Sequence, residues 1–123
     1  MNVLVVDDDK SMALLIAATL RALAKRIEVA STFAEAKEWL KKFVFQIVLL
    51  DIGLPDSLAE DTISRVSEMR VGNNKVVIIT GAWPPRAILR PEDTGADAVI
   101  YKGDMDMLDK LKALVSKPAG AMP

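Results

Sequence analysis

The chain has 123 residues, so we expect one domain that is large enough to bury a core without disulfides or metal ions. It contains neither Cys nor His, which excludes disulfides, thiol nucleophiles, Ser-His catalytic pairs and Cys or His metal ligands. The formal net charge of −1 argues against direct binding of nucleic acid, because contacts to phosphates need concentrated Lys and Arg.

The first predicted elements are a strand and a helix. Residues 3–6, Val-Leu-Val-Val, form an apolar run that is typical of a buried strand, and three aspartates (residues 7–9) follow it directly. This run is too short for a signal peptide and no stretch could span a bilayer, so we expect a cytoplasmic protein without membrane contact. A helix should run from Ser11 to about Lys25, capped by Asp9 or Ser11, with these residues facing the sheet: Met12, Leu15, Ile16, Leu20 and Leu23.

The longest apolar run lies in the middle of the chain and marks the central strand. Before it, a short strand is predicted over residues 27–30, and a helix over residues 33–42 with a Ser-Thr pair as its cap. The run itself, residues 47–50, leads without interruption into Asp51, and a Gly and a Pro follow. Such a pattern is typical of a strand buried on both faces, as in parallel sheets.

The second half of the chain continues the alternation. The elements predicted there are a helix over residues 58–70, a strand over 76–80, a helical segment over 83–95, a strand over 98–101 and a helix over 105–116. In the first of these helices Ile63, Val66 and Met69 should face inward. Three prolines limit the helical segment to one or two turns.

Five predicted strands alternate with five helical segments. This pattern predicts an α/β fold, a doubly wound five-stranded parallel sheet with helices on both faces. We expect one domain over residues 1–117, and a disordered tail or the start of a linker over residues 118–123.

Polar residues end most of the predicted strands: Asp7 and Asp8, Asp51, Thr80 and Lys102. In a doubly wound sheet the carboxyl ends of the strands border one crevice, so these groups should face one another. Two like charges about 4 Å apart repel by roughly 4 kcal/mol at an effective dielectric near 20, so three carboxylates need raised pKa values or a cation. Oxygen ligands without His or Cys suit Mg²⁺.

A carboxylate beside Mg²⁺ can act as a nucleophile toward a phosphoryl group, and Asp51 would then form an aspartyl-phosphate. Lys102 and Thr80 would supply a cation and a hydrogen-bond donor to the phosphoryl oxygens. Each residue alone also has an ordinary interpretation: a solvated acidic loop and helix cap, a polar strand end, a surface lysine. Their coincidence at one predicted crevice favours the reactive interpretation.

The chain resembles the receiver domain of bacterial two-component response regulators over residues 2–116. The motifs that carry the resemblance are residues 3–9, 47–56, 77–81, 95–98 and 101–102. The resemblance implies a flavodoxin-like fold with strand order 2-1-3-4-5, and transfer of a phosphoryl group to Asp51 from a sensor histidine kinase or histidine phosphotransfer protein. It also implies Mg²⁺-dependent self-phosphorylation from phosphodonors and autodephosphorylation at this residue. It is compatible with a homodimer and leaves the downstream target unidentified.

The same resemblance implies roles for individual residues. Asp8 and Asp51 would bind Mg²⁺ directly, together with the backbone carbonyl of Gly53, and Asp7 would act mainly through water. Lys102 would pair with Asp51 before phosphorylation and with the phosphoryl group afterwards.

Thr80 would turn inward to bond the phosphoryl group and so carry the change to the last elements of the chain. Four departures from the family pattern concern this transmission of the phosphorylated state. Val99 stands at the usual aromatic position, with Tyr101 on the same strand face, and Gly103 replaces the usual Pro. Ala59 replaces a common Gly, and the segment that usually moves contains three prolines: Pro84, Pro85 and Pro91. Two of them, the missing aromatic residue and the proline-containing segment, favour an alternative, a receiver-fold interaction module that acts independently of phosphorylation. A metal-dependent phosphatase of another α/β family is disfavoured, because Gly53 stands where a second acid would be needed.

Overall fold

The structure is a computed structural model, and it describes residues 1–52, 62–81 and 94–116. Five strands form one parallel sheet in the order β2-β1-β3-β4-β5. The strands are β1 (Asn2–Val6), β2 (Arg26–Ala30), β3 (Ile47–Asp51), β4 (Lys75–Thr80) and β5 (Ala98–Tyr101). The helices within the described residues are α1 (Lys10–Leu20), α2 (Phe33–Lys42), α3 (Thr62–Met69) and α5 (Met107–Ser116). The predicted parallel α/β sheet and its strand order are confirmed.

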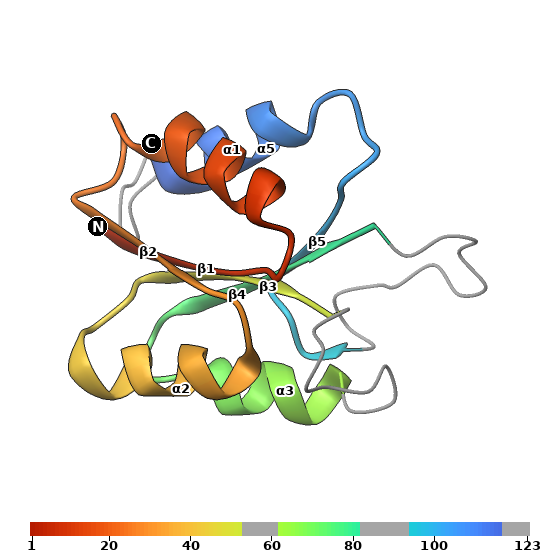
Figure 1. The fold of residues 1–123 in the computed structure, drawn as a ribbon. Helices are drawn as coiled ribbons and strands as arrows, with labels where there is room; N and C mark the ends of the chain where they lie inside the picture. Colours follow the sequence, from red (N-terminus) through yellow and green to blue (C-terminus); the bar gives the residue numbers. More distant parts are fainter. Residues whose placement is uncertain (53–61, 82–93, 117–123) are drawn as a thin grey trace.

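Helices cover both faces of the sheet, α1 and α5 on one side and α2 and α3 on the other (Figure 1). Because successive strand residues point to opposite faces, each central strand contributes side chains to two hydrophobic cores, one on each face of the sheet. In β3, Ile47 and Leu49 pack in the core with α1 and α5, whereas Val48 and Leu50 pack in the core with α2 and α3. All five residues of β3 are buried, as its unbroken apolar run predicted.

The first helix is shorter than predicted. It begins at Lys10, because the side chain of Asp9 accepts a hydrogen bond from the Met12 N–H at 3.1 Å and caps the helix. It ends at Leu20, whose carbonyl accepts the N–H of Ala24 at 3.0 Å in the turn that follows. The prediction to Lys25 therefore counted this turn as helix.

The inward faces of two helices also differ from the prediction. Leu15 and Leu23, expected to face the sheet, are 45% and 40% exposed, and Ile63 of α3 is 63% exposed. In α3 the inward residues Val66 and Met69 are buried as predicted. The buried residues of α1 are Ala13, Ile16, Ala17 and Leu20, which repeat at helical spacing and include two small residues that allow close packing on the sheet.

Several sequence predictions concern residues outside the described ranges. These are the Gly53 carbonyl, the start of the helix predicted from residue 58, the prolines between residues 83 and 93, and the tail over residues 118–123. Within the described ranges, no helix is long and apolar enough to cross a membrane.

Arg70 ties the edge strand β5 to the turn between α3 and β4. Its Nη1 donates to Asp97 Oδ2 at 3.0 Å, and its Nη2 donates to the Gly95 carbonyl at 2.7 Å. Asp97 Oδ2 also accepts the N–H of Val76 at 2.8 Å. These bonds hold the start of β5 against the start of β4. Lys102, which follows the other end of β5, therefore lies at the carboxyl edge of the sheet.

We expect Arg70→Ala and Asp97→Ala each to lower the free energy of unfolding by about 1–2 kcal/mol, because each leaves a charged group without its partner. The double variant should lose less than the sum, because both substitutions remove one shared interaction. Urea denaturation followed by circular dichroism measures all three losses. Strictly additive losses would show that the two side chains act separately.

Candidate functional site

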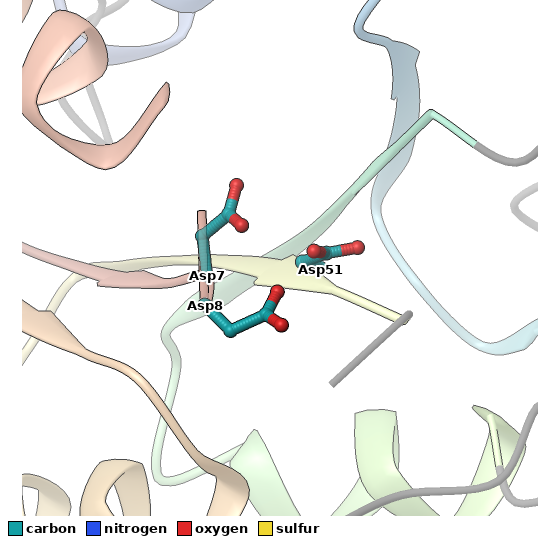
Figure 2. Close-up of side chains that lie close together, drawn as sticks. All are labelled: Asp7, Asp8 and Asp51. Atoms are coloured by element: carbon teal, nitrogen blue, oxygen red, sulfur yellow. The ribbon is translucent and has the colours of Figure 1, made fainter. Parts of the chain in front are cut away.

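The acidic residues predicted from the strand ends lie together at the carboxyl edge of the sheet. β1 and β3 are neighbours with Val6 level with Leu50, so Asp7 follows β1 beside Asp51 at the end of β3. One carboxylate oxygen each from Asp7, Asp8 and Asp51 lies within 4.8 Å of the others, and Figure 2 shows all three side chains at this edge. Asp7 and Asp51 are buried and Asp8 is exposed, so the cluster opens to solvent at Asp8.

The amine of Lys102 lies between two of these carboxylates. Its Nζ is 2.9 Å from Asp7 Oδ2 and donates a hydrogen bond to Asp51 Oδ2 at 3.3 Å. The contact with Asp7 is an ion pair without hydrogen-bond alignment, and Asp7 Oδ2 has no hydrogen-bond donor among the described residues. The other oxygen of Asp7, Oδ1, accepts the N–H of Asp9 at 2.9 Å and fixes the turn before α1.

Burial and the carboxylates act in opposite directions on the pKa of Lys102. Burial disfavours the charged amine and lowers the pKa, but contact with Asp7 and the charge of Asp51 outweigh burial, so the pKa is raised above its ordinary value. Lys102 therefore remains an ammonium at neutral pH. Three carboxylates and one ammonium leave two formal negative charges in the cluster.

The path of the Lys102 side chain depends on the end of β4. The N–H of Lys102 donates to the Thr80 carbonyl at 2.9 Å and extends the pairing of β4 with β5 by one residue. A Cβ at Gly81 would lie 3.3 Å from Lys102 Cδ, tighter than ordinary van der Waals contact, so a glycine here leaves room for the lysine stem. This role of Gly81 was not among the sequence predictions, although a glycine in a strand pattern often marks a close approach of another part of the chain.

Thr80 lies at the same edge of the sheet. It is the last residue of β4, is buried, and is level with Tyr101 of β5. Asp51 is level with Ile79, so Thr80 lies one residue further along the edge. Of the predicted site residues, the structure brings together Asp7, Asp8, Asp51 and Lys102, places Thr80 at the same edge, and does not describe Gly53.

The donor set of this cluster fits Mg²⁺. Carboxylate oxygens are the ligands that this ion prefers, and it commonly binds one or two of them together with waters. Asp7 Oδ2 is buried and, apart from its ion pair with Lys102, meets no hydrogen-bond donor among the described residues, so a water bound to the ion would satisfy it. The two uncompensated negative charges match the charge of a divalent ion. Asp7, Asp8 and Asp51 are the described residues that could hold such an ion together.

Lys102→Met should lower the free energy of unfolding in metal-free buffer by about 1–3 kcal/mol at neutral pH, because it leaves two buried carboxylates without a counter-charge. Since folding raises the pKa of Lys102, its stabilising effect is complete below about pH 10 and is lost as the pH rises through the folded-state pKa. Denaturant titrations of both proteins from about pH 7 to about pH 11 should therefore show a constant difference that shrinks only above about pH 10.

Lys110→Met is a matched control for this experiment. Its amine pairs with Asp104 at 3.1 Å on the surface, so removing it should cost much less than removing Lys102. Equal losses in the two variants would contradict the buried ion pair.

Solved receiver domains share this architecture. The response regulator receiver domain protein (CheY-like) from Methanospirillum hungatei JF-1 is 28% identical, with a TM-score of 0.72 over 93% of this chain and 92% of that chain. The response regulator TrrA from Thermotoga maritima, in complex with Mg²⁺-BeF, is 25% identical, with a TM-score of 0.74 over 94% and 96%. A BeF3-activated DrrB receiver domain is 26% identical, with a TM-score of 0.70 over 93% and 92%.

A comparison with curated proteins found no match. A family model described as the response regulator receiver domain matches residues 3–114, which include every strand of the sheet from Val3 onward and all of the acidic cluster. With this match, and with the parallel sheet and the acidic edge already described, the chain belongs to the response regulator receiver domain family.

Proposed function

We propose that this receiver domain is a phosphorylation-controlled signalling switch. Asp51 would accept a phosphoryl group from a sensor histidine kinase or a histidine phosphotransfer protein, with Mg²⁺ bound. The observation that carries the proposal is the contact of one amine, Lys102, with the buried carboxylates of Asp7 and Asp51, beside the exposed carboxylate of Asp8. The similarity to TrrA, solved with Mg²⁺-BeF, supports the proposal.

In the proposed reaction a carboxylate oxygen of Asp51 attacks the phosphorus atom of the donor. A phosphorus–oxygen bond forms while the bond from phosphorus to the donor's leaving group breaks, and the leaving group keeps the electron pair of that bond. A carboxylate is already an anion at neutral pH, so the attack needs no general base. The absence of His from the chain agrees with this chemistry.

The other residues would bind and orient the groups around Asp51. Asp8 and Asp51, with the carbonyl of Gly53, would hold Mg²⁺ directly, and Asp7 would hold it through water. The bound ion would supply positive charge beside the phosphoryl oxygens. Lys102 would leave the Asp51 oxygen and bind a phosphoryl oxygen, because both are anions within reach of the same amine.

Thr80 is the residue we propose to carry the phosphorylated state to β5. Its hydroxyl would donate a hydrogen bond to a phosphoryl oxygen. Tyr101 is level with Thr80 on the neighbouring strand, so it is the residue of β5 that a movement of Thr80 would reach first.

A second candidate function is an interaction module that acts independently of phosphorylation. Val99, at the position where the family usually has an aromatic residue, is an aliphatic side chain packed against the core that α2 and α3 form. A short, packed side chain of this kind is poorly suited to exchange between two positions, which favours a surface that does not respond to Asp51.

Asp51→Asn should abolish phosphorylation by a small phosphodonor such as acetyl phosphate with Mg²⁺, because an amide oxygen is a far weaker nucleophile than a carboxylate. Lys102→Met should slow the reaction by about 100-fold, because it removes the cation beside the phosphoryl oxygens. Intact-mass spectrometry measures the added phosphoryl group over time. Asp109→Asn, an exposed acid in the first turn of α5, is the matched control and should be labelled like the wild type.

The same samples separate the two candidate functions. Labelling of Asp51→Asn at the wild-type rate would place the acceptor elsewhere. If the wild type is labelled but its amide NMR spectrum changes only around Asp51, leaving β5 and α5 unchanged, the interaction module is favoured. Changes that extend to Thr80 and Tyr101 favour the switch.

Mg²⁺ should stabilise the wild type through the acidic cluster. At a free concentration about 100 times its Kd, the ion adds about 2.7 kcal/mol to the free energy of unfolding. Asp8→Asn should lose most of this effect, because it removes a carboxylate that lies within 4.8 Å of the other two. Calorimetric unfolding with Mg²⁺ and after EDTA measures the difference, and an undiminished effect in Asp8→Asn would place the ion elsewhere.

A further inference from the structure

A hollow of about 350 Å³ lies at the amino-terminal end of the strands, at the opposite end of the sheet from the acidic cluster. Its wall includes the first residues of β3 and β4, the turns before them, and Leu114 of α5. Two apolar side chains at this hollow, Val44 and Val71, are 75% and 54% exposed. The hollow and its two valines, which we call the basal hollow, form an apolar surface with no covering side chain among the described residues.

One lysine lines the basal hollow, and two more are neighbours of its lining residues. Lys75 lines the hollow and is exposed. Lys42 ends α2 two residues before Val44, with its amine 5.9 Å from the centre of the Trp39 ring, and the backbone N–H of Lys25 donates to the carbonyl of Met1, which lines the hollow. None of these three lysines forms an ion pair with a described residue. Lysines near helix C-termini balance the helix dipole, but that effect does not account for exposed valines. The surface therefore suits an apolar side chain that is flanked by acids.

Such a side chain lies at the opposite end of the sheet, on the side of the acidic cluster. Met105, in the turn between β5 and α5, is fully exposed and stands between Asp104 and Asp106. Both carboxylates contact Lys110, at 3.1 and 3.5 Å, so this turn keeps one formal negative charge. Methionine is flexible and polarizable, and it fills irregular apolar gaps well.

We propose that copies of this chain associate head to tail, with Met105 of one copy in the basal hollow of the next. Asp104 and Asp106 would then face Lys75, which lines that hollow. Because the two surfaces differ, the contact is heterologous, and an assembly of any length keeps one free hollow at one end and one free Met105 at the other, so association is open-ended. The contact is small and partly electrostatic, so it should be weak and sensitive to salt.

Sedimentation velocity over a concentration series tests the proposal with the whole chain. EDTA is included so that divalent ions do not bridge the carboxylates, and no phosphodonor is present. At about 20 mM salt the weight-average mass should rise above 13.4 kDa with concentration and show no plateau at the dimer, and about 0.5 M salt should reverse the rise.

Three surface variants identify the two halves of the contact. Met105→Glu removes the inserted side chain, and the double variant Val44→Glu with Val71→Glu blocks the basal hollow; each should stay monomeric at concentrations where the wild type associates. Leu14→Glu, 68% exposed on α1, is the matched control and should associate like the wild type. All four positions are more than half exposed, so the substitutions should leave the fold intact, which circular dichroism checks.

Mixing the two monomeric variants gives the sharpest result. The hollow variant retains an intact Met105 and the Met105→Glu variant retains an intact hollow, so an equimolar mixture should form a 1:1 dimer that grows no further. A mixture that stays monomeric while the wild type associates overturns the proposal, as does a wild type that stays monomeric throughout. Loss of association in Leu14→Glu would assign the interface to α1 and would also overturn the proposal.

Discussion

The contact of Lys102 with Asp7 and Asp51 is the interaction on which the rest of the site depends. Asp7 follows β1 and Asp51 ends β3, whereas Lys102 follows the edge strand β5, with β4 between β5 and β3. Like charges about 4 Å apart repel by roughly 4 kcal/mol at an effective dielectric near 20, so the acids need this counter-charge even before a metal binds. Features outside the charged cluster support the same contact: Gly81, next to it, leaves room for the lysine stem, and Arg70, at the other end of β5, holds the start of that strand.

Strand register is what brings these distant residues together. Successive residues of β3 enter different cores, and every one of them is buried. A shift of β3 by one residue would exchange its two faces and move Asp51 out of level with the end of β1. Packing of Val and Leu side chains therefore sets the distance between the carboxylates, and the core determines the geometry of the acidic edge.

The sequence predicted those features that depend on local pattern and on strand ends. The bounds of α2 and β5 agree with their predictions because a cap or a β-branched apolar run marks them, and the acids were expected together because parallel strands end at one edge. The predicted inward face of α1 was right for Ile16 and Leu20 and wrong for Leu15 and Leu23, because Ala13 and Ala17 were not counted as core residues. The resemblance implied that Lys102 pairs with Asp51; its shorter contact with Asp7 depends on the side-chain path past Gly81, which no sequence pattern encodes.

The charges in the cluster explain why one lysine can serve every state of the proposed switch. Without a metal, the three carboxylates and Lys102 carry two negative charges in total, and a divalent ion would bring this to zero. Phosphorylation replaces the single charge of Asp51 with up to two charges on the phosphoryl group, so the metal-bound site would then carry one net negative charge with Lys102 included, and the ammonium would stay bound. Because its raised pKa keeps Lys102 protonated in this acidic surrounding, the amine can exchange a carboxylate partner for a phosphoryl partner without gaining or losing a proton.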